Sequence, residues 1–123
     1  MIKSSFFQVG MVALGGAFGA ILRDVVANTS MARFMGLPIG LLIVNTFGCL
    51  LAGVLQVVIV KYQLGSYWHS FLFTGLISSF TTFSALILQF DQILKENILH
   101  MIAAAILSIV LGILAYRVGG LLV

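Results

Sequence analysis

Charge is what this 123-residue chain has least of, since Asp, Glu, Lys and Arg together make up 7% of it. A soluble domain carries about 25% charged residues, whereas 62% of the residues here are hydrophobic. This balance excludes a soluble globule and indicates a membrane protein. The six basic residues stand singly along the chain, so they form no patch for nucleic acid.

Disulfides and reactive groups are also scarce. Cys49 is the single cysteine and lies inside an apolar run, so we interpret it as a small buried hydrophobe. No Asp, Glu or Lys lies well inside an apolar run, which argues against a proton relay. No motif pairs a nucleophile with a base or groups metal ligands, so the sequence does not favour an enzyme.

What the chain does have is four apolar runs, each close to the roughly 20 residues that a helix needs to cross a bilayer. They predict an all-α membrane protein whose helices cover roughly residues 6–26, 39–60, 69–90 and 98–122. The connecting stretches 27–38, 61–68 and 91–97 are too short to hold a soluble domain. We therefore expect a single four-helix transmembrane domain over residues 1–123.

The basic residues give almost no orientation signal. If the spans alternate, one side of the membrane carries Lys3, Lys61 and Arg117, and the other carries Arg23, Arg33 and Lys95. Cytoplasmic loops normally carry the excess of Lys and Arg. The balance favours dual topology with two copies packed antiparallel, although a weak bias in a small protein can also arise by accident.

Small residues four positions apart predict close helix contacts. These residues are Gly15 and Gly19, Gly48 and Ala52, and the stripe Ala104, Ser108 and Gly112.

Neutral polar residues are the remaining signal inside the spans. Asn45, near the middle of the second span, either lines a polar passage or forms an interhelical hydrogen bond. Six Ser and Thr residues lie between Thr74 and Ser84 in the third span. Their hydroxyls compete for backbone hydrogen bonds, which predicts a third helix broken near its middle. Carbonyls exposed at such a break can bind a cation, and a mere kink is the alternative.

Three segments, in order, resemble the small bacterial fluoride channels of the Fluc or CrcB family: GGAFGAILR at 15–23, VNTFG at 44–48 and GLISSFTTFS at 75–84. The resemblance covers essentially the whole chain. It implies a passive, fluoride-selective channel that exports toxic fluoride across the bacterial cytoplasmic membrane. It also implies an antiparallel dimer, with two pores and a structural sodium ion at its centre.

The resemblance assigns roles residue by residue. The positions expected along the fluoride path are Arg23, Asn45, Phe83, Ser84 and Ser108. The sodium ligands it implies are the backbone carbonyls of Ser78 and Thr81.

These assignments suit the chemistry of a small, firmly hydrated anion. Compact donors such as the Asn45 amide and hydroxyl groups can replace its water, and the ring edge of Phe83 carries a positive partial charge. Arg23 can raise the local anion concentration in a vestibule, or it can snorkel beside Asp24.

The sequence also departs from the family pattern. Ser78 and Ser79 replace a glycine pair, Ala85 and Leu86 replace Thr and Phe, and Gly112 lacks a second hydroxyl one turn after Ser108. We expect Leu86 to shape the wall of the path without a polarised ring edge. This departure keeps a heterodimer with a related chain open beside the homodimer.

Two other functions fit a chain of this size. A small multidrug-type, proton-coupled exporter would need a glutamate embedded in the membrane, and the first span has none. A non-transporting membrane assembly subunit is the other.

Overall fold

The computed structural model describes residues 5–29 and 37–123, so Lys3 and Arg33 lie outside the described residues. In chain order the elements are α1 (Phe6–Thr29), α2 (Ile39–Lys61), α3 (Ser66–His69), η1 (Ser70–Ile77), α4 (Ser78–Phe80), α5 (Ser84–Glu96) and α6 (Ile98–Leu121). In these ranges four segments are long and apolar enough to cross a membrane, and α3 to α5 together form the third. The expected all-α, four-span architecture is confirmed.

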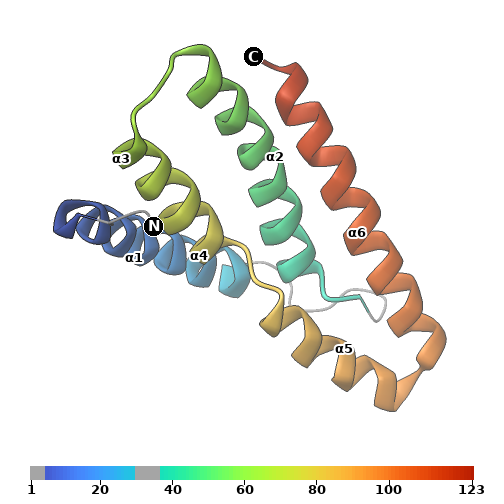
Figure 1. Cartoon of the computed structure of the whole chain (residues 1–123). Helices are drawn as coiled ribbons and strands as arrows, with labels where there is room; N and C mark the ends of the chain where they lie inside the picture. Colours follow the sequence, from blue (N-terminus) through green and yellow to red (C-terminus); the bar gives the residue numbers. More distant parts are fainter. Residues whose placement is uncertain (1–4, 30–36) are drawn as a thin grey trace.

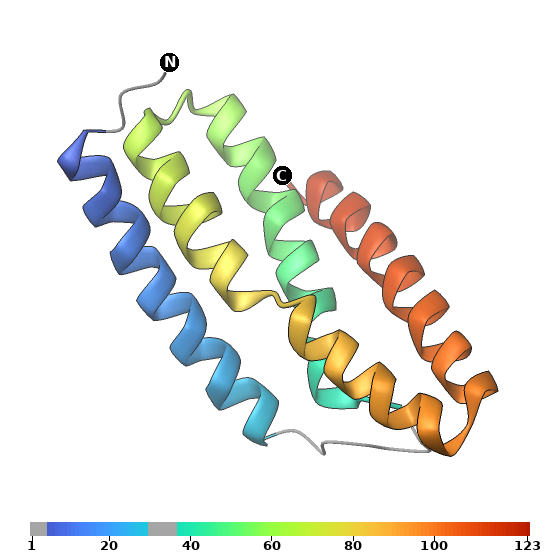
Figure 2. The same ribbon diagram turned by 60° about the horizontal axis from the view of Figure 1, so that its bottom comes forward.

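The helices pack in two long pairs (Figures 1 and 2). In both views α1 runs beside the continuous stretch from α3 to α4, α2 runs beside α6, and α5 leads from the first pair to the second. Gly15 and Gly19 allow the first contact, because a Cβ atom on either would overlap the carbonyl oxygen of Phe71 or Leu76. The close contact expected of this glycine pair is therefore present.

The closest approaches of α2 to α6 lie at glycines other than those expected. A Cβ atom on Gly53 would overlap the Tyr116 carbonyl, and one on Gly119 would overlap the Leu50 carbonyl. Gly48 instead faces the third span, where an added Cβ would overlap the methyl group of Thr81. This glycine lets the break of the third helix lie directly on α2.

The third helix is broken, as predicted. The helix that starts at Ser66 stops at Phe80, Thr81 is extended with φ −79° and ψ 151°, and α5 starts at Ser84. The sequence did not predict that residues 70–77 would form a π-helix. Directly after this π-helix, the Ser78 hydroxyl donates back to the Phe73 carbonyl at 2.9 Å.

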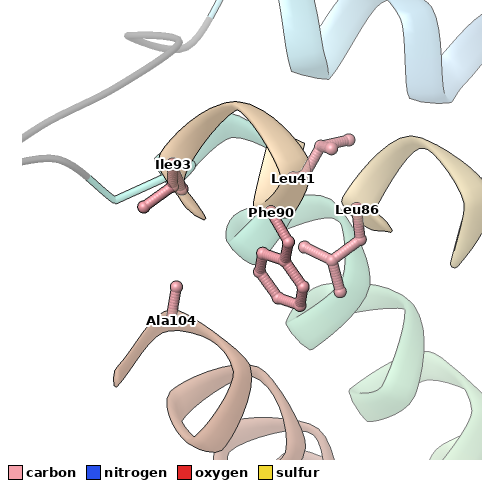
Figure 3. Packing of buried hydrophobic residues seen from close by; sticks show 5 residues of the cluster. All are labelled: Leu41, Leu86, Phe90, Ile93 and Ala104. Atoms are coloured by element: carbon pink, nitrogen blue, oxygen red, sulfur yellow. The ribbon is translucent and has the colours of Figure 1, made fainter. Parts of the chain in front are cut away.

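A cluster of apolar side chains fixes α5 against both helices of the second pair. It contains Leu41 from α2, Leu86, Phe90 and Ile93 from α5, and Ala104 from α6 (Figure 3). The cluster fixes the position of α5 relative to α2, and so also the position of the break that directly precedes α5.

The expected loop at 91–97 is wrong, because α5 continues to Glu96. Ile93 is only 1% exposed and belongs to the apolar cluster. On the exposed side, Lys95 pairs with Asp91 one turn earlier at 2.6 Å. The chain then turns at Asn97, whose side-chain oxygen accepts from the first N–H groups of α6. Burial of Ile93 thus anchors a polar-looking segment that remains helical.

Candidate functional site

The break in the third helix is held by Asn45 of α2. Its Nδ2 donates to the Thr82 carbonyl at 3.0 Å, and the Thr82 N–H donates to its Oδ1 at 2.8 Å. Of the two readings of Asn45, the interhelical hydrogen bond is therefore observed. Among the described residues, none accepts from the second N–H of this amide.

Thr82 lies just before α5 and caps its first turn. The Ala85 N–H donates to Thr82 Oγ1 at 3.3 Å, which is the geometry of a helix N-cap. Thr82 Oγ1 and Ser84 Oγ also share a hydrogen bond of 3.3 Å. The sequence did not single out Thr82, because a capping hydroxyl cannot be distinguished from its neighbours in a run of Ser and Thr.

A cavity of about 280 Å³ opens at the break. Its polar edge comes from Asn45 and the extended segment, and its apolar floor comes from α2. Phe83 borders it with a ring that is 74% exposed. The lining residues are Asn45, Gly48, Cys49, Ala52, Ile77, Thr81, Thr82 and Phe83. The structure thus brings two predicted path residues, Asn45 and Phe83, to one cavity.

Ser84 and Ser108 are not among the residues that line this cavity. Ser84 follows Phe83 directly and is exposed. Ser108 lies on α6, one turn before Gly112, where an added Cβ atom would contact the Cys49 sulfur at 3.4 Å. The Ser108 hydroxyl donates to the Ala104 carbonyl at 2.7 Å. Its proton is therefore bonded within its own helix.

Arg23 is not among the residues that line this cavity. It lies on α1 and is half-buried. Its neighbour Asp24 accepts a hydrogen bond from Asn28 at 2.9 Å, and in the described ranges no ion pair joins Arg23 to Asp24. A role in a path therefore requires Arg23 to act from a distance, on the local concentration of anions.

Leu86 does not shape the cavity wall as expected. It is 6% exposed and packs in the apolar cluster with Leu41 and Phe90. Leu86, Phe90 and Ile93 follow the helical spacing of one face of α5, and that face points toward α2 and α6. Leu86, which stands where the family pattern has its second phenylalanine, is thus a core residue.

Gln89 is a half-buried polar residue that no sequence motif predicted. Its Oε1 is buried, and no described residue donates to it. It borders a separate cavity of about 310 Å³, together with Asn28 of α1 and Gly40 of α2. A glutamine in an apolar helix gave no pattern that separates it from a lipid-facing residue.

Residues 10–120 match the family described as CrcB-like protein, Camphor Resistance (CrcB). The chain belongs to the CrcB family. The match extends from α1 to α6 and includes Asn45, the break and Phe83. The resemblance inferred from the three sequence motifs is confirmed.

Several CrcB relatives carry the name fluoride-specific ion channel FluC. The one from Vibrio cholerae is 32% identical over 118 residues, which are 94% of each chain. The one from Methylobacillus flagellatus is 36% identical over 92% of this chain and 91% of its own. The one from Paracoccus denitrificans is 34% identical over 99% and 95%. With four apolar spans, this CrcB chain is a multi-pass protein of the bacterial inner membrane, and its family consists of ion channels rather than enzymes.

Proposed function

We propose that this chain is a passive, fluoride-selective channel that exports fluoride across the cytoplasmic membrane and so relieves fluoride toxicity. The observation that carries the proposal is the cavity at the break, whose polar groups are neutral. None of its lining residues is charged, so an anion can be bound there without being trapped by a full positive charge. The name shared by the CrcB relatives supports fluoride as that anion.

Asn45 and Phe83 are the central residues of the proposed path. The second N–H of Asn45 offers a compact donor, and a small hydrated anion needs compact donors to replace its water. The exposed ring of Phe83 can present its edge, where the partial charge of an aromatic ring is positive. Ser84 adds a hydroxyl beside Phe83.

Ser108 and Arg23 extend the proposed path beyond the cavity. The Ser108 hydroxyl now donates to the Ala104 carbonyl, so its O–H must turn away from that carbonyl to donate to an anion. Arg23 raises the concentration of fluoride at one entrance, because a positive charge near a low-dielectric wall attracts anions.

The proposed assembly is an antiparallel dual-topology dimer, formed by two copies of this chain or by this chain and a related one. The balanced basic residues support both orientations. The exposure of Phe83 in the single chain supports a second subunit that completes the path.

We further propose a structural sodium ion at the dimer centre, bound by the carbonyls of Ser78 and Thr81 from each subunit. The residues present fit this ion, because Thr81 has left the helical conformation and interrupted membrane helices use such carbonyls to bind Na⁺. When bound, the ion supplies a positive charge that attracts the carbonyl dipoles of both breaks.

Fluoride efflux from proteoliposomes tests the function. With a fluoride gradient and no proton gradient, we expect rapid passive efflux of fluoride and none of chloride. Asn45→Asp, which places an anion in the proposed anion path, is the matched non-conducting control. Proton-coupled uptake of a cationic drug would instead identify an exporter, and no transport of either kind would identify an assembly subunit.

A further inference from the structure

The Asn45 amide binds both polar main-chain groups of Thr82. Nδ2 donates to the carbonyl at 3.0 Å, and the N–H donates to Oδ1 at 2.8 Å. Paired residues of antiparallel strands exchange two bonds in the same way, and such a pair fixes orientation as well as distance. Asn45 therefore sets the orientation of the two peptide groups on either side of the Thr82 Cα atom.

The first of these peptide groups contains the Thr81 carbonyl. A trans peptide group is planar, so its C=O and N–H point in opposite directions, and the described chain has no cis peptide bond. Because the Thr82 N–H points toward Asn45, the Thr81 carbonyl points away from the Asn45 side chain. Turning this carbonyl would break the bond from Thr82 N–H to Oδ1.

Asn45 also affects the Ser78 carbonyl. In an uninterrupted α-helix the Thr82 N–H would donate to the carbonyl four residues earlier, which is that of Ser78. The preceding N–H, of Thr81, still donates to the Ile77 carbonyl at 3.0 Å, but the Thr82 N–H donates to Asn45 instead. The last helical hydrogen bond is thus the one that the Ile77 carbonyl accepts. Asn45 binds the N–H of Thr82, which would have donated to the Ser78 carbonyl in a continuous helix.

We propose that Asn45 is a positioning residue for the cation site: it releases the Ser78 carbonyl from the helix and orients the Thr81 carbonyl, without touching the ion. This inference rests on the sodium site proposed above. It gives Asn45 a second role, separate from its place beside the fluoride path, and it predicts that sodium affinity depends on the two hydrogen bonds to Thr82.

The test is sodium-dependent thermal stability of the purified full-length protein in fluoride-free detergent solution. Sodium chloride is titrated against N-methylglucamine chloride, and the midpoint is the sodium concentration that gives half of the rise in Tm. Asn45→Leu keeps the branched shape of the side chain and removes both bonds. We expect its midpoint to rise roughly 10- to 100-fold, the usual effect of removing a group that orients a metal ligand. A bond that only stabilised the fold would lower Tm at every sodium concentration and leave the midpoint unchanged.

Thr46→Val is the matched control. It removes a hydroxyl from the same turn of α2, but Thr46 lines a different groove, beside Phe47 and Leu107, so the parent midpoint is expected. If Asn45→Leu does not fold, Asn45→Ser replaces it with the same expectation, because a hydroxyl is too short to bind both groups of Thr82.

The outcomes separate the two proposals. An unchanged midpoint in the folded Asn45 variant, with a clear sodium effect in the parent, would overturn the positioning role and leave the sodium site standing. No sodium effect in the parent would overturn the sodium site and the positioning role together. Fluoride efflux from the parent tests the channel function independently of both results.

Discussion

At the break, the side-chain amide of Asn45 provides more than one hydrogen-bonding group. Asn45 can hold the main chain of Thr82 with one N–H and its oxygen, and still offer the other N–H to the cavity, because a primary amide has two donors and one strong acceptor. A serine or a leucine at this position could not do both. The two bonds to Thr82 explain why an asparagine near the centre of an apolar helix is compatible with stability.

Phe83 is expected to contribute to conduction through its ring edge. Phe83→Ile keeps an apolar side chain beside the cavity but removes the polarised edge, whose contacts contribute about 0.5–1.5 kcal/mol. Fluoride efflux at equal reconstituted protein should fall roughly two- to tenfold. Phe18→Ile, which alters an exposed ring on α1 away from the cavity, should conduct like the parent. Parent-like efflux from Phe83→Ile would show that this ring serves in packing only.

Leu86→Phe should destabilise the protein and leave conduction no higher than in the parent. Leu86 is 6% exposed within the apolar cluster (Figure 3), and overpacking a core typically costs about 1–3 kcal/mol. A lower Tm in detergent checks this expectation. A variant with a raised Tm and faster efflux would mean that a ring at this position reaches the path after all.

At the scale of whole elements, the two long helix pairs depend on glycines at their crossing points. Gly19→Ala should separate α1 from the third span, because the added Cβ would overlap the Leu76 carbonyl, which belongs to the backbone and cannot rotate away. We expect Gly19→Ala to have a lower Tm than the parent and to give less assembled protein. Gly10→Ala is the matched control, since nothing lies within 4 Å of its added Cβ, and the better helix propensity of Ala favours it by about 1 kcal/mol. Equal Tm values for the two variants would contradict this view of the α1 contact.

The sequence predicted those features of the elements that arise from local chemistry. The apolar runs predicted the four spans, and the dense hydroxyls between Thr74 and Ser84 predicted the break. The extension of α5 to Glu96 could not be predicted in the same way. It depends on burial of Ile93 in the apolar cluster that also contains Ala104, and this cluster forms only when α5 and α6 pack.

The site was predictable to a similar degree. Asn45 and Phe83 stood out as a polar group and a motif aromatic in apolar spans, and the structure places both at one cavity. The pairing of Asn45 with Thr82 joins residues 37 positions apart, so no local pattern could predict it. Leu86 was misplaced because a motif position shows which residue is present but not which side of its helix meets the core.

For the whole molecule, the balance of basic residues makes orientation the decisive question. With Lys3, Lys61 and Arg117 opposing Arg23, Arg33 and Lys95, a single cysteine added at the C-terminus of a Cys49→Ser chain should be labelled from both sides of the membrane in cells. The two orientations should be present in similar amounts. Neither set of loops and termini has the excess of Lys and Arg that would retain it in the cytoplasm.

Adding charge should then control function through topology alone. Tyr62→Lys with Ser66→Lys gives one side two more cations at exposed positions, and should fix that side in the cytoplasm. If the channel is an antiparallel dimer, cells that express this variant alone should lose fluoride efflux. Co-expression with a variant biased the other way, Leu94→Lys with Leu99→Lys, should restore efflux, because each chain supplies the orientation that the other lacks. Full efflux from either biased variant alone, with its C-terminus labelled from one side only, would show that parallel copies or a single chain conduct.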